Sequence, residues 1–324
     1  MRNLREVWRK LHECCAAHEW RGHDPYDGLN SPLARLLPGK KARQAWTQLH
    51  RRSPINFRPL VGIEPTLNPK AVALFAMGSG EPKLLKLLDS LRNPDGGWGY
   101  PFDWQSRAFL APRGTSNLIC TAVAAKALKC DVTGFVEKHL MRDGYITYIA
   151  GSDTQVHNVN MIGAALLGRK DCMEWSVGRQ RPDGSWWYGE AENQHWIDSF
   201  HTGYNLMALQ ETGWFPEAAR RGFEYWDRTF WRKDFAPRYC HNQDLPFDTH
   251  CCATGILTYL AFGDVEKANV VARWALENMW DNRGFFWYQR GRWHTNRICY
   301  MRWTQAWMYY ALAKLIKANE TANR

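Results

Sequence analysis

Apolar residues recur at helical spacing along most of the chain, and short turns rich in glycine and aromatic residues separate the helical stretches. In one example, "RPDGSWWYGE" is followed by "DSFHTGYNLMAL", where polar and aromatic residues give way to an apolar helix. The same order recurs at "NPDGGWGYPFDW" with "TSNLICTAVAAKAL", "RDGYITYIAG" with "VHNVNMIGAALLG", "WRKDFAPRYC" with "FDTHCCATGILTYLA", and "DNRGFFWYQRG" with "YMRWTQAWMYYALA". Equivalent leucines lie at Leu128, Leu166, Leu209, Leu260 and Leu312, at intervals of 38, 43, 51 and 52 residues. This spacing predicts a repeated pair of helices.

The helices fall into two classes. Charged amphipathic stretches such as "EAARRGFEYWDRTFW" and "EKANVVARWALENMW" predict outer helices, whereas the Ala- and Gly-rich helices after the turns predict inner ones. Upstream, "LARLLPGKKARQAWTQLH" and "LNPKAVALFAMG" are interpreted as a degenerate first pair, and "EPKLLKLLDSL" begins the second. Six pairs, without polar capping repeats, favour a closed ring over an open solenoid.

We therefore predict an all-α fold, an (α/α)6 toroid in a single domain over residues 1–324, with an N-terminal arm at about residues 1–34. The Asp-Gly turns flanked by Trp and Tyr predict short β-hairpins at the rim.

In such a ring the N-termini of the inner helices converge on one mouth, where unpaired N–H groups and helix dipoles favour anions. The candidate residues placed there are Asn117, His157, Asn158, Asp198, His201, Tyr204, Asp248, His250, Tyr300 and Arg302. Histidines at the helix starts of three successive repeats form the most specific part of this pattern. The alternative is that each one caps a helix or fills the core.

A second polar patch is "HDPYDGLNSP", residues 23–32. It is either an ordinary turn, since Asp, Asn, Gly and Pro form turns, or a loop that docks over the mouth and contributes Tyr26 and Asn30. Trp187, Trp303 and Arg297 complete the candidate binding residues.

Composition points to the class of ligand. The chain has 18 tryptophans and a net charge of +10. Aromatic faces beside basic groups suit acidic sugars, although a solvated basic surface is the alternative, and no nucleic-acid module is present. No apolar run reaches the ~20 residues of a membrane helix, and "MRNLREVWRKLHECC" lacks the features of a secretion signal, so a cytoplasmic protein without a transmembrane segment is expected.

Motifs of common cofactor and metal sites are missing. The nine cysteines include no CxxC pair, and the sequence contains no P-loop, GxGxxG or GxSxG motif. Asp248, His250, Cys251 and Cys252 are residue types that bind zinc, but neighbouring helical residues point in different directions and cannot all face one ion. We therefore expect neither a metal nor a cofactor.

The segments "DPYDGLNS", "DSFHTGYNL" and "FDTHCCATGI" resemble a bacterial group encoded with capsule, exopolysaccharide and O-antigen genes. Some of its members carry an aminolevulinate dehydratase label, which does not fit here, because that enzyme is a (β/α)8 barrel. In fold the chain also resembles the toroids of glucuronyl C5-epimerases, uronate lyases and unsaturated glucuronyl hydrolases. Its DG-Trp turns are similar to those of terpene cyclases, but it has no DxDD motif.

The leading hypothesis is an enzyme of polysaccharide biosynthesis that epimerises C5 of a uronate residue in an acidic glycan, either free or lipid-linked. The reaction needs two acid/base groups and a cation on the carboxylate. His201 and Tyr204 are expected near one face of the sugar, His250 or His157 on another, with Tyr300 nearby, and Arg302 or Arg297 on the carboxylate. A lyase needs the same residues, a hydrolase would use Asp198 and Asp248 as its carboxylates, and a non-catalytic glycan-binding ring is a further alternative.

Overall fold

A closed ring of six inner helices forms the centre of the protein. The computed structural model describes residues 3–107 and 109–322. The inner helices are α3 (Pro69–Ser79), α5 (Leu118–Leu128), α7 (His157–Leu167), α9 (Ser199–Thr212), α11 (Thr249–Ala261) and α13 (Trp307–Ala322). Each contacts the next in this order, and α13 contacts α3. The predicted (α/α)6 toroid is therefore confirmed.

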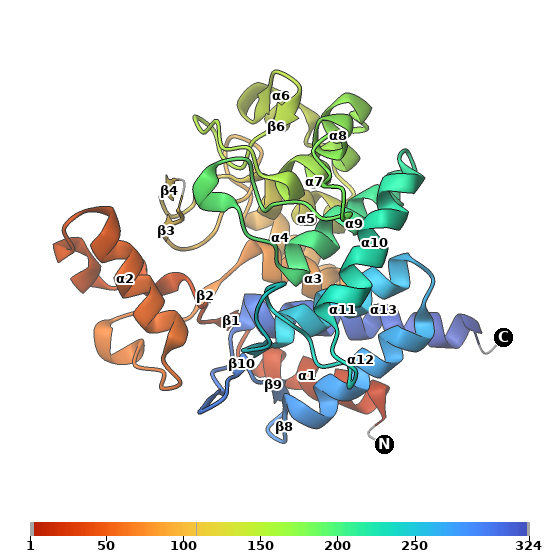
Figure 1. Cartoon of the computed structure of the whole chain (residues 1–324). Coiled ribbons are helices and arrows are strands. Elements are labelled where there is room, and N and C mark those ends of the chain that lie inside the picture. Colours follow the sequence, from red (N-terminus) through yellow and green to blue (C-terminus); the bar gives the residue numbers. More distant parts are fainter. Residues whose placement is uncertain (1–2, 108, 323–324) are drawn as a thin grey trace.

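Outer helices pack around this ring (Figure 1). They are α4 (Pro82–Ser90), α6 (Thr133–His139), α8 (Lys170–Val177), α10 (Pro216–Phe230), α12 (Val265–Asn278) and α1 (Leu4–Ala17). The pairing of α1 with α13 joins the beginning of the chain to its end. The interpretation of residues 33–50 as the outer helix of the first pair was wrong, because α1 occupies the last outer position.

Between α1 and α3 the chain leaves the ring and forms an extension, which Figure 1 shows at the left. We call residues 23–65 the arm. It contains α2 (Gly39–Arg52) and three 3-10 helices, η1 (Asp27–Asn30), η2 (Pro32–Leu36) and η3 (Pro59–Val61). Strands β1 (Arg21–Gly22) and β2 (Thr66–Leu67) pair antiparallel at its base. The arm thus differs from the one expected at about residues 1–34, because α1 belongs to the ring.

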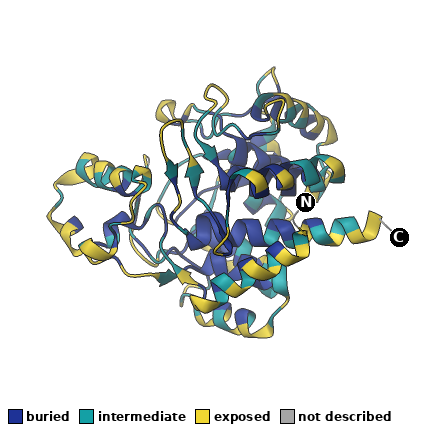
Figure 2. Cartoon of the chain, turned by 90° about the horizontal axis from the view of Figure 1, so that it is seen from below, coloured by how far each residue is buried: buried dark blue, intermediate teal, exposed yellow. Residues whose placement is uncertain are grey.

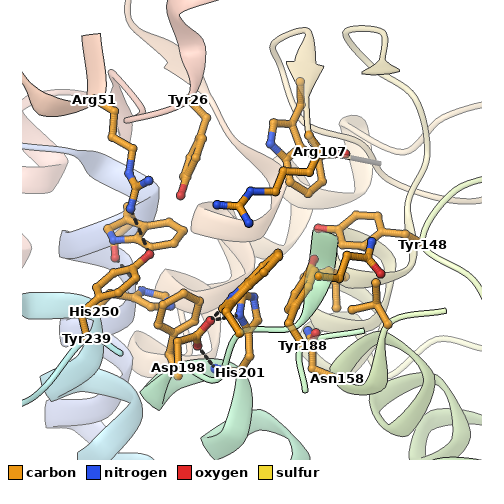
Figure 3. A pocket seen from close by; sticks show the side chains of 18 of the residues that line it. Tyr26, Arg51, Arg107, Tyr148, Asn158, Tyr188, Asp198, His201, Tyr239 and His250 are labelled. Atoms are coloured by element: carbon orange, nitrogen blue, oxygen red, sulfur yellow. Dashed lines mark hydrogen bonds and ion pairs between the residues drawn. The ribbon is translucent and has the colours of Figure 1, made fainter. Parts of the chain in front are cut away.

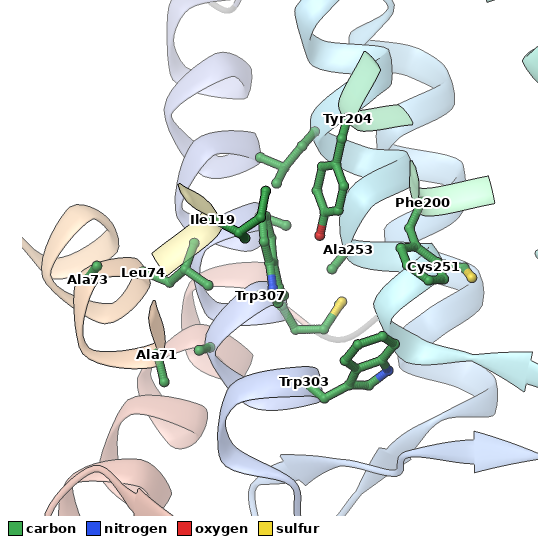
Figure 4. Close-up of a cluster of buried hydrophobic side chains, with 14 of the residues drawn as sticks. Ala71, Ala73, Leu74, Ile119, Phe200, Tyr204, Cys251, Ala253, Trp303 and Trp307 are labelled. Carbon is green, nitrogen blue, oxygen red and sulfur yellow. The ribbon is translucent and has the colours of Figure 1, made fainter. Parts of the chain in front are cut away.

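The two helix classes follow from what each helix packs against. Inner helices touch neighbours on several sides and are buried along most of their length, whereas outer helices alternate between buried and exposed residues (Figure 2). Small residues let the inner layer approach its surroundings closely: a Cβ on Gly255 would lie 2.3 Å from the Trp231 ring. Large apolar side chains, among them Phe200, Trp303 and Trp307, fill the middle of the ring (Figure 4).

Short antiparallel hairpins lie in the connections that lead into the inner helices, as predicted, but in the described chain only the hairpin around Asp143-Gly144 is built on an Asp-Gly turn. Three two-stranded pairs are β3 (Trp104–Gln105) with β4 (Leu110–Ala111), β5 (Met141–Arg142) with β6 (Tyr145–Ile146), and β8 (Trp280–Asp281) with β9 (Phe285–Phe286). In a fourth sheet, β10 (Gln289–Arg290) pairs with both β7 (Phe247–Asp248) and β11 (Thr295–Asn296). Across residues 3–107 and 109–322, no helix is both long and apolar enough to cross a bilayer.

Candidate active site

A cavity of about 670 Å³ opens over the N-terminal ends of the inner helices. One helical position supplies its floor. The second residue of every inner helix lines the cavity, if the π-helical turn Met301–Ala306 is taken as the start of the α13 helix. These residues are Lys70, Ile119, Asn158, Phe200, His250 and Arg302. The ring therefore brings six positions that are distant in sequence to one place.

Four of the six residues just before the inner helices cap those helices. The side chains of Asn68, Asn117, Asp198 and Asp248 accept hydrogen bonds from backbone N–H groups of the first turn. Such caps satisfy groups that the helix leaves unpaired. Asn117 and Asp248 do not line the cavity, and burial raises the pKa of Asp248 to about 6.

Asp198 combines capping with a contact to a histidine. Its Oδ1 accepts the backbone N–H of His201 at 2.9 Å, and its Oδ2 lies 2.7 Å from His201 Nδ1. The Trp196 indole donates to the same Oδ2 at 3.0 Å. Because a carboxylate accepts, Nδ1 carries the proton and Nε2 is left as the basic nitrogen. Nε2 has no hydrogen-bond partner among the described residues, so the pair is suited to remove a proton from a ligand (Figure 3).

Tyr204 and His250 form a second linked pair. His250 Nδ1 lies 2.8 Å from the backbone oxygen of Trp303, and a carbonyl oxygen can only accept, so Nδ1 carries the proton. His250 Nε2 then accepts the Tyr204 hydroxyl proton at 2.8 Å. Burial, strengthened by the nearby Lys70 charge, holds the pKa of His250 well below its usual value, and burial raises the pKa of Tyr204 well above 10. Both groups are therefore neutral and rigidly oriented at neutral pH.

Lys70 is a buried lysine without a carboxylate. Only 4% of the residue is exposed, and its Nζ lies 4.9 Å from the centre of the Trp307 ring and 5.7 Å from that of Tyr204. Among the described residues, Nζ has neither a hydrogen bond nor an ion pair. Burial, together with the Arg302 charge, lowers the pKa of Lys70 to about 7. An amine with this pKa can both accept and donate a proton near neutrality.

Two further cations extend into the cavity from near its rim (Figure 3). Arg51 of α2 donates to the hydroxyls of Tyr288 at 3.2 Å and Tyr239 at 3.0 Å, and no carboxylate of the described chain lies within 4.0 Å of it. Arg107 lies 4.6 Å above the Trp196 ring. Aromatic rings complete the wall: Tyr26, Tyr100, Phe102, Trp104, Phe109, Tyr148, Tyr188, Tyr239 and Trp303.

The "HDPYDGLNSP" segment docks against the ring, as one of the two interpretations expected. Asp24 binds Arg302 through two hydrogen bonds of 2.5 and 2.7 Å, and both side chains are 5% exposed. Asp27 binds Arg58 at 2.6 Å, and Arg58 donates to the Tyr300 hydroxyl at 2.8 Å. These bonds hold the loop so that Tyr26 lines the cavity.

The cavity thus collects part of the predicted set. It is lined by Tyr26, Asn158, Asp198, His201, Tyr204, His250, Arg302 and Trp303. Seven predicted residues lie outside the lining: Asn30, Asn117, His157, Trp187, Asp248, Arg297 and Tyr300. Asn30 donates to the Pro101 carbonyl, and Arg297 stacks on Trp287. Trp187 stacks on His195.

His157 illustrates why the three histidines are not equivalent. It is the first residue of α7, whereas His250 is the second of α11 and His201 the third of α9. One residue corresponds to a rotation of about 100° on a helix, so the three side chains point in different directions. His157 is enclosed away from the cavity, with its ring nitrogens 3.2 Å from Ser176 Oγ and 2.8 Å from Glu190 Oε1.

Lys70, Arg51 and Arg107 were not predicted. A pattern in the sequence points to Lys70, since it is a lone charge in the first turn of the apolar stretch "PKAVALFAM". Nothing comparable marks Arg51, which lies among other basic residues of α2 and reaches the cavity only because the arm folds back.

No group of three His, Cys, Asp or Glu residues within the described ranges is arranged to hold a metal ion. Around Asp248, the carboxylate accepts from Gln289 at 2.6 Å and from the His250 backbone, and both His250 ring nitrogens are occupied. Two of the residues considered for zinc, Asp248 and His250, are therefore engaged in hydrogen bonds of the protein.

No protein-family profile matches the chain, and no curated protein matches its sequence. Solved structures of similar fold do match. Cellobiose 2-epimerase from Spirochaeta thermophila DSM 6192 has 12% identity and a TM-score of 0.54, over 80% of this chain and 87% of that one. An unsaturated glucuronyl hydrolase specific for heparin has 11% identity and a TM-score of 0.52, over 79% and 85%. ent-Copalyl diphosphate synthase from Streptomyces platensis has 18% identity and a TM-score of 0.53, and the match spans 86% of this chain but 56% of the synthase. At these identities the similarity shows an α/α toroid.

Proposed function

We propose that the protein is a carbohydrate epimerase that inverts C5 of a uronate residue in an acidic glycan. One arrangement carries the proposal: a histidine held as a base by Asp198 and a buried lysine without a partner face the same cavity from different inner helices. Membership of a polysaccharide-biosynthesis group remains part of the proposal. The similarity of fold to a cellobiose 2-epimerase and an unsaturated glucuronyl hydrolase supports a carbohydrate substrate.

The two groups come from opposite sides of the ring. In the order α3, α5, α7, α9, α11, α13, the helix that carries His201 lies three positions from the one that carries Lys70. In the proposed reaction, His201 Nε2 removes the proton at C5 on one face of the sugar. The Lys70 ammonium, whose pKa of about 7 suits donation, returns a proton to the other face. The Tyr204 hydroxyl, fixed by His250, positions the ring between them.

Removal of this proton places negative charge on the adjacent carboxylate, which therefore needs positive partners. Arg51 fits this role best, because its present partners are neutral tyrosine hydroxyls. Arg302 fits it less well than expected, since Asp24 already neutralises it. The aromatic wall suits the apolar faces of sugar rings.

Two other reactions are less well supported by the cavity. A hydrolase of the two-carboxylate type needs a pair across the scissile bond, and Asp198 is the only carboxylate among the described lining residues. The aromatic wall would stabilise the carbocations that a cyclase forms. The positive charges of Lys70, Arg51 and Arg107, however, would repel positive charge in the substrate.

The test is proton exchange with solvent. Oligosaccharides that contain glucuronate are incubated with the protein in D2O, and C5 is analysed by NMR and mass spectrometry. We expect deuterium at C5 and a mixture of the two C5 epimers. His201→Ala serves as the inactive control.

Other products would contradict the proposed epimerisation and indicate another function. An unsaturated sugar without epimerisation indicates a lyase, and new reducing ends indicate a hydrolase. Binding without any of these changes, in a panel of acidic glycans, indicates a glycan-binding ring.

A further inference from the structure

The arm, residues 23–65, is basic: it has seven Lys and Arg residues against Asp24, Asp27 and Glu64, a net charge of +4. All seven basic residues lie within residues 28–63, which contain no Asp or Glu. Of these seven, Arg58 alone is paired with a carboxylate in the described part of the protein. The basic residues are Arg35, Lys40, Lys41, Arg43, Arg51, Arg52 and Arg58.

The same segment also exposes large apolar side chains. Five of the seven exposed large hydrophobic residues of the described chain lie on it: Leu33, Leu36, Leu49, Ile55 and Leu60. Leu36 is 80% and Leu60 is 87% exposed. Single exposed leucines are common, but a concentration of them on one element indicates a contact surface.

Three of these apolar residues lie on neighbouring turns. Ser31 Oγ donates to the Val61 carbonyl at 2.6 Å, and a Cβ on Gly62 would lie 3.2 Å from the Pro32 ring. These contacts place η2, which carries Leu33 and Leu36, beside η3, which carries Leu60.

Another side of the arm faces the ring and is covered. Arg43 of α2 donates to the Gln105 side chain at 3.1 Å, and Gln44 donates to the Ser106 carbonyl at 3.1 Å. Figures 1 and 2 show the rest of the arm projecting from the ring, with much of its surface exposed. Four of the basic residues, Arg35, Lys40, Lys41 and Arg52, are exposed together with the apolar ones and are available to a partner.

We propose that the arm docks on a lipid bilayer that contains anionic lipids. Lysine and arginine attract the negatively charged surface, and leucines enter the boundary between headgroups and acyl chains. A nucleic acid would satisfy the charge but would leave the leucines in water. The docking does not depend on the proposed reaction. If both hold, Gln44, Arg51 and Arg52 of α2, which line the cavity, place its mouth near the membrane and suit a lipid-linked acidic glycan.

Vesicle flotation tests the docking with the full chain. The vesicles are phosphatidylcholine alone or phosphatidylcholine with about one third phosphatidylglycerol, a composition chosen to give a negative surface. We expect binding to the anionic vesicles that weakens with added salt. Leu36→Ser/Leu60→Ser and Arg35→Glu/Lys41→Glu should each weaken binding at least about tenfold.

Trp293→Ser is the matched control, because Trp293 is 88% exposed but lies outside the arm. It should bind vesicles as the wild type does. All substituted residues are exposed, so unchanged circular dichroism and thermal unfolding are expected throughout.

Three results would overturn the proposal. One is binding no stronger to anionic than to neutral vesicles. Another is wild-type vesicle binding by the leucine variant together with competition by single-stranded DNA, which would make the arm a surface for polyanions. The third is a dimer that the leucine substitutions dissociate, without vesicle binding, which would make the partner a second copy of the chain.

Discussion

Residue position within the first helical turn decides what each polar side chain of this protein does. Four of the six residues just before the inner helices cap them, and the second residue of each inner helix lines the cavity. The sequence patterns located the first turns of the inner helices correctly. They did not predict to within one residue where each helix begins. For this reason His201 and His250 were placed at the mouth as the structure has them, while His157 was predicted there and lies elsewhere.

His201 and His157 give a matched comparison. We expect His201→Ala to lower the rate of C5 exchange by about 10²–10⁴-fold, the usual contribution of a general base. Its stability should change little, because the side chain borders the cavity and Asp198 keeps its cap. His157→Ala should lower the free energy of unfolding by about 1–3 kcal/mol, since it leaves a buried void and removes one of the hydrogen-bond partners of Ser176 and of Glu190. Turnover per folded molecule should then be normal.

Exchange rates and urea unfolding of both variants provide the measurement. A destabilised His201→Ala with wild-type turnover would make His201 a structural residue and remove the proposed base.

Lys70 should make stability depend on pH. In the folded protein its pKa is about 7, below the usual 10.5, so between these values the unfolded chain binds more protons. Stability therefore rises with pH across this window, and the cost of the buried charge is fully present below pH 7. From pH 7 to 9 the free energy of unfolding of the wild type should rise by about 2 kcal/mol more than that of Lys70→Met. Urea unfolding at both pH values measures this difference.

Parallel pH dependences of the two proteins would contradict the lowered pKa. A separate readout addresses catalysis: Lys70→Met should lose C5 exchange even at the pH where its stability equals that of the wild type.

At the scale of elements, local patterns predicted the inner and outer helices and the hairpins, because each depends on which faces are buried. They failed at the arm. Helix α2 is amphipathic and directly precedes α3, so sequence proximity favoured a pair, yet the last outer position is filled by α1. Closure of a ring is a contact between the two ends of the chain, and no local periodicity encodes it.

The Asp24–Arg302 pair anchors the arm to the ring and is the next prediction. Asp24→Asn leaves the buried Arg302 guanidinium without a carboxylate, which should cost about 3–5 kcal/mol. Adding Arg302→Met removes the unpaired charge, so the double variant should regain much of this loss. Denaturant unfolding of both single variants and the double variant gives the coupling energy. If the double variant is as unstable as the sum of the single ones, the two side chains do not act as a pair.

At the scale of the whole molecule, α1 fills the last outer position of the ring and brings the two ends of the described chain together. Arg5 and Glu320 form an ion pair of 2.6 Å, and α1 packs along α13. Folding should therefore depend on the packing of α1 against α13 more than on the order in which the helices follow one another along the chain. A circular permutant, joined through a Gly/Ser linker of about ten residues and opened at the exposed turn between Gly168 and Arg169, should fold with nearly unchanged thermal stability.

Deletion of residues 1–19 is the contrasting variant. It removes Val7, Leu11 and Cys15, which are at most 3% exposed, and uncovers the face of α13. Burial of each large apolar side chain contributes about 1.5–3 kcal/mol to the free energy of unfolding. The sum lost with α1 approaches the total stability of an average domain, so this variant should be largely unfolded. Circular dichroism melting and size-exclusion chromatography compare it with the permutant. A deletion variant that melts like the wild type would show that the packing of α1 on α13 contributes little to stability. A permutant that fails to fold would show that the order of the helices along the chain does matter.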